Sequence, residues 1–292
     1  MPTLAKIIGD VRHRLAGVGA YSDNVSELAV AVDADDLTLK LDSSAFTAES
    51  GIYEIGLEKV RVKSTDTATA SLTLYTFGRG YDGTAPVAHP AGSEVVHNPL
   101  FAASTVASEV NGVLHEVYPS LYGVRQFEAP YTLAGFTIPV DGVGVIAVYR
   151  QAAGAVGCHR LDQWRFDPNS GNGLWVKHVA AGETVRVVYA ARPGVFDLTD
   201  PGVLSEDFSD VTGLDDRVAD LMALGVAYRL SPFFDMARLG ATGAEPRADG
   251  QSKPPGAGAA ASRLLLAEFT QRLQQESAVL AKENPIRTHR EW

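Results

Sequence analysis

Arg79, Asp82 and His89 are the three side chains whose types and close spacing could support chemistry. A histidine and a carboxylate can act as general acid and base, and an arginine can stabilise negative charge that develops during a reaction. However, no nucleophile or second base stands at a recognisable spacing from them. We therefore expect these residues to hold structure together rather than to catalyse a reaction.

The glycines beside these residues also favour a structural role. Gly80 and Gly83 permit backbone angles that are closed to other residues, and an Asp-Gly pair is a strong turn signal. The Arg79 guanidinium can form two parallel hydrogen bonds with a carboxylate, and Glu58 on the preceding predicted strand is the candidate partner. His89, just beyond the loop, is then expected to be a hydrogen-bonded anchor.

Other motifs for chemistry are missing from the sequence. It contains no Walker loop, no glycine-rich dinucleotide motif, no HExxH and no GxSxG. A single cysteine, Cys158, excludes an intrachain disulfide and a cysteine-rich zinc site. The sequence therefore predicts a protein that is not an enzyme and that needs no cofactor or metal.

Charge and composition narrow the class of protein further. The chain has 292 residues and a formal net charge of −10, which argues against a broad nucleic-acid-binding face because phosphate contacts need clustered Lys and Arg. An acidic surface is compatible with a channel that conducts DNA without holding it. No apolar run approaches the ~20 residues of a membrane span, and the charged N-terminus does not resemble a signal peptide.

Hydrophobic periodicity predicts an α+β fold with two small antiparallel β-domains, each barrel- or sandwich-like. Short alternating runs separated by turn-forming residues occupy 21–99 and again 123–198. In the second β-domain, Trp164 and Trp175 flank the turn-rich segment 167–173. We expect them to form an aromatic core on facing strands, and a protein-contact or carbohydrate-binding surface is the alternative.

Helical spacing of apolar residues predicts the rest of the chain. We expect an N-terminal helix in 1–20, a connecting helix in 100–122, and a helical part in 199–283 with long helices. The stretch 241–260 is rich in Gly, Pro and Ala and is expected to be a flexible loop. Residues 284–292 are expected to form a docking tail.

Two sets of residues in the C-terminal third are candidate contacts. Arginine and tryptophan are typical interface anchors, and we expect a partner protein to meet the tail at Ile286, Arg287, Arg290 and Trp292. Acids near the start of a helix stabilise its dipole, but they can also face a lumen or a basic neighbour. The acids concerned are Asp215, Asp216 and Asp220.

The segment 77–96, FGRGYDGTAPVAHPAGSEVV, resembles the RGxxGT…H…G…V signature of small β-domains in tailed-phage structural proteins. The residues that carry the likeness are Arg79, Gly80, Asp82, Gly83, Thr84, His89, Gly92 and Val95. The upstream segment 50–62, SGIYEIGLEKVRV, matches the preceding half of the same pattern. The likeness covers residues ~35 to 97. The resemblance of the C-terminal helices to helical adaptors beneath a portal ring is one of layout only.

This resemblance implies a phage head-to-tail connector in the adaptor role. Such a protein forms a homo-oligomeric ring, usually a dodecamer, between the portal protein and a stopper or tail-terminator protein. It would be assembled in the host cytoplasm, reside in the virion neck, have no membrane partner, and meet DNA only as passing cargo. The alternative is a minor tail or baseplate protein that binds a host receptor or carbohydrate. A wall hydrolase would need two carboxylates ~5–10 Å apart across a cleft, and no motif supports one.

Overall fold

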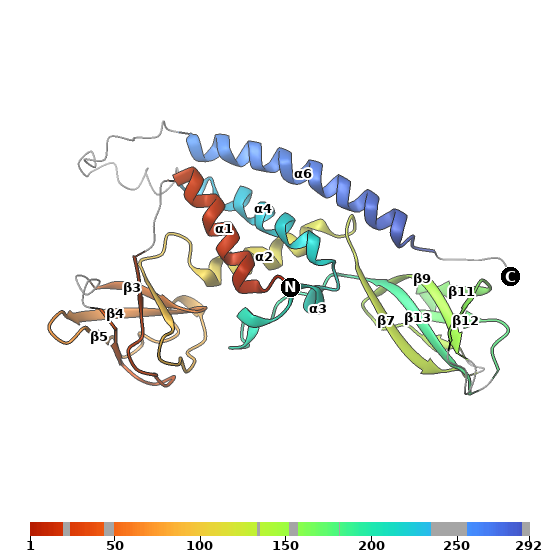
Figure 1. Cartoon of the computed structure of the whole chain (residues 1–292), viewed down its shortest axis with the longest axis horizontal. Helices are drawn as coiled ribbons and strands as arrows, with labels where there is room; N and C mark the ends of the chain where they lie inside the picture. The colour runs from red at the N-terminus through yellow and green to blue at the C-terminus, as the bar shows by residue number, and fades with distance from the viewer. Residues whose placement is uncertain are drawn as a thin grey trace.

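A computed structural model describes residues 1–19, 24–43, 50–132, 135–151, 157–180, 182–234 and 256–287. It shows a group of helices at the centre of the molecule with an antiparallel β-domain at each end (Figure 1). This arrangement confirms the predicted α+β fold with two small β-domains. Among the helices in these ranges, none combines the length and the apolar character that a bilayer span requires.

The N-terminal β-domain is a six-stranded sheet in the order β1-β6-β3-β4-β5-β2. Backbone hydrogen bonds also join the regions beside the two edge strands: the Ala29 amide donates to Lys40 O at 2.8 Å, and the Asp42 amide donates to Glu27 O at 3.0 Å. The sheet therefore curls into a small barrel around an aliphatic core. Its strands are β1 (Asn24–Glu27), β2 (Thr38–Lys40), β3 (Gly51–Ile55), β4 (Glu58–Asp66), β5 (Ser71–Leu74) and β6 (Glu94–His97).

The second β-domain has two sheets, in the orders β10-β9-β13-β7 and β11-β12-β8. Trp164 is buried in the core that these sheets share, together with Phe166. Trp175, which was expected to pair with Trp164 in this core, is instead half-buried opposite Arg165 on the other face of its sheet. The reason is the two-residue period of a strand, which places Val176 rather than Trp175 opposite Trp164. The strands are β7 (Gly123–Pro130), β8 (Phe136–Thr137), β9 (Gly142–Gln151), β10 (His159–Leu161), β11 (Trp164–Asp167), β12 (Gly173–Val176) and β13 (Thr184–Ala191).

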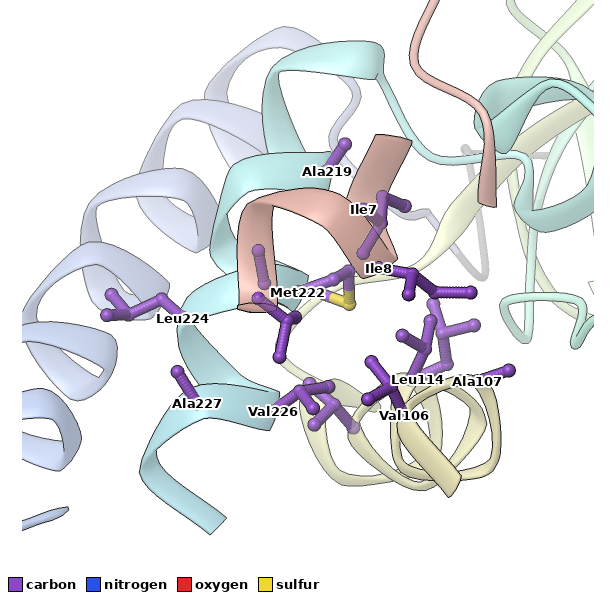
Figure 2. Close-up of a cluster of buried hydrophobic side chains, with 14 of the residues drawn as sticks. Ile7, Ile8, Val106, Ala107, Leu114, Ala219, Met222, Leu224, Val226 and Ala227 are labelled. Carbon is purple, nitrogen blue, oxygen red and sulfur yellow. The ribbon is translucent and has the colours of Figure 1, made fainter. Parts of the chain in front are cut away.

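The central helices come from the beginning, the middle and the end of the chain. They are α1 (Leu4–Gly19), α2 (Ala103–Val117), α3 (Phe208–Thr212), α4 (Ala219–Leu230) and α6 (Ala257–Glu283). In Figure 2, Ile8 of α1, Val106 of α2 and Met222 of α4 point into one cluster, and Leu224 points toward α6 on the other side of α4. These helices therefore share one hydrophobic core.

This core differs from the organisation that the sequence suggests. The segment 100–122 was expected to be a connector, and the helical part was expected within 199–283. Instead, α1 and α2 are packed against α4 as integral parts of the helical unit. The physical reason is that each has an apolar stripe too wide for one sheet contact to cover, and burial against other helices removes that stripe from water.

Helix α6 lies along the outside of this core and reaches toward the second β-domain (Figure 1). Its inner side contributes Phe269, which is 2% exposed, together with the partly buried Leu265, Leu273 and Leu280. Leu264, which the periodicity also places on the apolar face, is instead 74% exposed. Residues 235–255, which include most of the expected loop 241–260, lie outside the described ranges, whereas Ala257 to Ala260 belong to α6.

Replacing Gly225 on α4 tests the close approach of three helices. A Cβ at this position would lie 2.7 Å from Cγ1 of Val113 and 2.9 Å from Cε2 of Phe269. We expect Gly225→Ala to lower the free energy of unfolding by about 1–3 kcal/mol, because overpacking outweighs the gain in helix propensity. Urea titration measures this change.

The matched control is Gly9→Ala on α1, where a Cβ meets nothing within 4 Å. This variant should raise the free energy of unfolding by roughly 0.5–1 kcal/mol through helix propensity alone. Equal stabilisation by both variants would contradict the packing described for α2, α4 and α6.

Candidate functional site

The RGxxGT segment is organised around the carboxylate of Glu58, which is 1% exposed. Arg79 donates from Nε to Oε1 at 2.7 Å and from Nη2 to Oε2 at 3.0 Å. His89 Nε2 lies 2.9 Å from Oε2 and donates to it, since an ionised carboxylate only accepts. The amides of Gly80 and Val87 donate at 2.9 and 3.2 Å. These contacts confirm the predicted Arg79–Glu58 pair and the anchoring role of His89.

Arg79 also ties this carboxylate to two loops of the β-domain. Its Nη1 donates to the carbonyl oxygens of Asp33 and Asp36, and its Nη2 donates to Val87 O at 2.5 Å. One guanidinium therefore connects β4 with the loop that precedes β2 and the loop that precedes β6. Removing it would leave the buried Glu58 charge without its arginine partner and would take a donor from three carbonyl groups.

The remaining residues of the motif shape the turn that carries Arg79. Gly80 has a φ of +58°, and a Cβ there would lie 2.7 Å from Thr84 O. Thr84 Oγ1 accepts from the Lys59 amide at 3.0 Å. Asp82, also at positive φ, accepts from Lys59 Nζ at 2.8 Å. Gly83 has a φ of +80°. Each residue that the sequence singled out in this loop thus has a conformational or hydrogen-bonding role.

The electrostatics of Glu58 do not suit acid–base chemistry near neutral pH. Burial acts to raise its pKa, but hydrogen bonds from His89, Arg79 and the Gly80 amide outweigh burial and lower the pKa from 4.5 to about 2. A group useful as a general acid or base has a pKa near the working pH. Glu58 therefore remains ionised and serves as a fixed acceptor.

A second buried carboxylate, Glu54 on β3, fastens the β-domain to the helices. It is 2% exposed. Arg12 of α1 donates from Nη2 to Glu54 Oε1 at 2.6 Å and also reaches Phe101 O at 2.9 Å. The amide of Ala103, at the start of α2, donates to Glu54 Oε2 at 2.6 Å. Glu54 thus links the β-sheet, α1 and the N-terminal end of α2.

Between the N-terminal β-domain and the helices lies a cleft of about 1120 Å³, which we call the interdomain cleft. Its lining residues include Leu57 in the turn between β3 and β4, Thr84 of the motif loop, Ser104 of α2 and Leu204. Leu57, Leu198 and Leu204 are only partly buried. The motif loop therefore forms one wall of an open, partly apolar hollow.

The three acids that were predicted to face a lumen or a neighbour have different surroundings. Asp220 binds Arg14 of α1 and Arg272 of α6. Burial acts to raise its pKa, but these two arginines outweigh burial and lower it. Asp215 accepts from the Arg217 amide at 3.0 Å and remains exposed. Asp220 is thus an internal clamp between helices, while the neighbour-facing role stays a prediction for Asp215.

Asp216 has a buried oxygen, Oδ1, with no hydrogen-bond partner within the described ranges. Its neighbour Arg217 lies 3.1 Å from Glu276 and 3.0 Å from Glu283, measured from Nε and Nη2 to the carboxylate oxygens. Arg217 therefore binds the segment 215–217 to α6, and this segment is not a uniformly free acidic surface.

The first residues of the predicted docking tail contact the second β-domain of the same chain. The Arg287 amide donates to Val145 O of β9 at 2.8 Å. Ile286 lies over Gly144, where a Cβ would collide with Ile286 Cγ2. Tyr122 Oη donates to Asn284 O at 2.7 Å. Ile286 and Arg287 therefore contact the second β-domain, whereas Arg290 and Trp292 lie outside the described residues.

The sequence analysis did not identify one further surface, formed by Arg61, Tyr75, Phe77 and Tyr81, which we call the aromatic–arginine surface. The Arg61 guanidinium carbon lies 5.0 Å from the Tyr75 ring centre and 5.3 Å from that of Tyr81. Phe77 is 89% exposed. A phenylalanine between two turn residues, Thr76 and Gly78, was the sequence signal for this surface.

No group of three His, Cys, Asp or Glu side chains within the described ranges is placed to hold a metal ion. No known protein family matches the chain, and no curated protein matches it in sequence. The likeness of the RGxxGT segment to phage structural domains therefore remains a prediction.

The pKa of Glu58 predicts an acid sensitivity of the fold. Its folded-state pKa of about 2 lies below the unfolded value of 4.5, so its stabilising contribution is complete above pH ~4.5 and is lost as pH falls toward 2. We expect on the order of 3 kcal/mol of unfolding free energy to disappear over this interval from this group. Urea titrations at several pH values, with an NMR titration of the Glu58 carboxyl, measure it.

Two variants make the assignment specific. Glu58→Gln should flatten the acid dependence and lower stability at pH 7 by about 3–5 kcal/mol, because a buried charged pair is broken. Glu128→Gln removes an exposed carboxylate paired with Arg186 and should retain the wild-type acid dependence. An NMR pKa for Glu58 near 4.5 would refute the proposed cause.

Proposed function

We propose that this chain is a structural virion protein of a tailed phage, a head-to-tail adaptor that forms a ring between portal and stopper or tail protein. The observation that carries this proposal is the Glu58 cluster. The motif residues Arg79, Gly80 and His89 are all engaged in holding one buried carboxylate. This is the behaviour expected of a signature that specifies a fold rather than a reaction.

The arrangement of the parts supports a connecting role. Two β-domains stand at opposite ends of a helical centre (Figure 1). The Glu54–Arg12 ion pair fastens one end to that centre, and hydrogen bonds of the Asn284 carbonyl and the Arg287 amide fasten the other. A protein built in this way can hold two partners at a fixed distance from each other. Its chemistry is interface burial and charge complementarity, with no bond made or broken.

The portal-side contact is assigned within this proposal to Arg290 and Trp292. Ile286 and Arg287 already contact the second β-domain, so they position the segment that follows. The net charge of −10 suits a ring through which DNA passes as cargo. The ring would reside in the virion neck after assembly in the host cytoplasm.

The test is electron microscopy with mass analysis of the purified chain, alone and with the portal encoded beside it. We expect a ring, formed alone or on the portal. Arg290→Glu combined with Trp292→Ala should abolish portal binding without changing the thermal midpoint. Interface anchors of these types typically contribute 2 kcal/mol or more, roughly a thirtyfold change in affinity.

The matched variant is Ile286→Ala, which removes an internal contact. It should lower the thermal midpoint while the affinity for portal changes less than in the Arg290/Trp292 variant. A persistent monomer or trimer that ignores portal would overturn the proposal and favour the minor tail protein, for which binding to cells and sugars is the next measurement.

A further inference from the structure

The aromatic–arginine surface is held in place by backbone hydrogen bonds. The Arg61 amide donates to Gly78 O at 2.7 Å, and the Gly78 amide donates to Tyr75 O at 2.8 Å. A Cβ at Gly78 would lie 2.6 Å from Arg61 O, so the turn closes tightly against β4. Phe77 is therefore presented to solvent by a fixed turn, which lowers the entropy lost when a partner covers it.

Two cations on and beside this surface have no carboxylate partner. Arg61 belongs to the surface, and Lys63 lies beside it on the same solvent face of β4. Neither forms an ion pair with any carboxylate in the parts of the chain that the structure describes. By contrast, Arg12, Arg14 and Arg79 all bind carboxylates. The rings of Tyr75 and Tyr81 hold the Arg61 guanidinium ready to pair with an incoming carboxylate.

The interdomain cleft has complementary chemistry. Its partly buried leucines, Leu57, Leu198 and Leu204, form an apolar wall. Glu94 and Asp200 also line it, are exposed, and have no cationic partner among the described residues. Its volume of about 1120 Å³ is ample for an aromatic and an arginine side chain.

We propose that the aromatic–arginine surface of one copy docks into the interdomain cleft of a second copy. Phe77 packs against the leucines of the cleft, and Arg61 and Lys63 pair with Glu94 and Asp200. Two unpaired cations thus meet two unpaired carboxylates beside an apolar wall. This contact would supply the side-to-side interface of the ring, and in that respect the inference rests on the proposed function.

The surface suits a protein better than nucleic acid. Specific and non-specific DNA binding uses many phosphate contacts, commonly 6–10, and this surface offers only two unpaired cations in a chain of charge −10. Arginine and aromatic residues are the types enriched at the centres of protein interfaces. Because one Phe and one Arg cover a small area, the contact is weak between two isolated copies and is strengthened when several copies assemble together.

Cross-linking between two single-cysteine chains tests the contact. Cys158 is exposed and is first replaced by serine in all chains. One chain then carries Thr76→Cys, beside Phe77, and the other Thr199→Cys in the lining of the cleft. The docking side chains stay in place, and a disulfide joining positions 76 and 199 can form only between copies. We expect the disulfide-linked heterodimer to form at least about tenfold faster than in the control mixture, since docking raises the local concentration.

The control mixture pairs Thr199→Cys with Val140→Cys, because Val140 is 97% exposed on the second β-domain. Adding Arg61→Glu to the Thr76→Cys chain should reduce the rate about tenfold, and Asp200→Arg in the partner chain should restore it. A cross-linking rate equal to that of the control would overturn the inference. The inference would also be overturned if the chain retained single-stranded DNA, if Arg61→Glu abolished this retention, and if no cross-link formed.

The same variants separate this inference from the proposed function. Rings that form on portal although the Thr76→Cys and Thr199→Cys chains fail to cross-link would refute the contact and leave the adaptor role intact. Efficient cross-linking by a chain that never binds portal would support the contact and refute the adaptor role.

Discussion

The ionised carboxylate of Glu58 is the constraint on which the N-terminal β-domain depends. A charge taken out of water is tolerated only when donors replace its hydration. Here the donors come from Arg79, Gly80, Val87 and His89, which all lie between β5 and β6. The need to satisfy one carboxylate therefore fixes the path of this segment against β4.

The same principle operates where the domains meet. Glu54 accepts hydrogen bonds from Arg12 and from the first amide of α2. Asp220 accepts hydrogen bonds from Arg14 of α1 and Arg272 of α6. Each acid joins segments that are distant in sequence. Apolar burial is non-directional, so these polar contacts determine how the packed segments are oriented. Hydrophobic burial holds the helices together, while these charged pairs specify their relative positions.

Local patterns predicted those parts of the structure that local physics determines. Alternation located most strands, helical spacing located α1, α2 and α6, and the fork geometry of Arg79 predicted its pairing with Glu58. The assignment of α2 as a connector missed its place in the core, because periodicity shows an apolar face but not what covers it. Leu264 was misplaced for a related reason: α6 is in contact along one narrow stripe, so some apolar positions remain exposed.

The role of Asp220 also could not be predicted from the sequence. A run of acids is visible in the chain, but the arginines that bind Asp220 stand at positions 14 and 272, and only the tertiary fold brings them together. The aromatic–arginine surface was missed because a single exposed phenylalanine resembles a core residue in any hydrophobicity pattern. The turn residues beside Phe77 were its signal in the sequence, and the fold shows that its side chain is exposed.

The helical core is built from segments that are far apart in the sequence, so its parts become available in a fixed order during synthesis. Thr3 forms a β-bridge with Asp207, and α1 packs against α4, so α1 leaves the ribosome long before these partners are made. The strands of the N-terminal barrel, by contrast, all lie between Asn24 and His97 and find their partners early. During translation the chain therefore carries a finished barrel next to an unfinished helical centre. The surfaces that depend on both are completed only after α4 and α6 have been made, which delays any assembly through them.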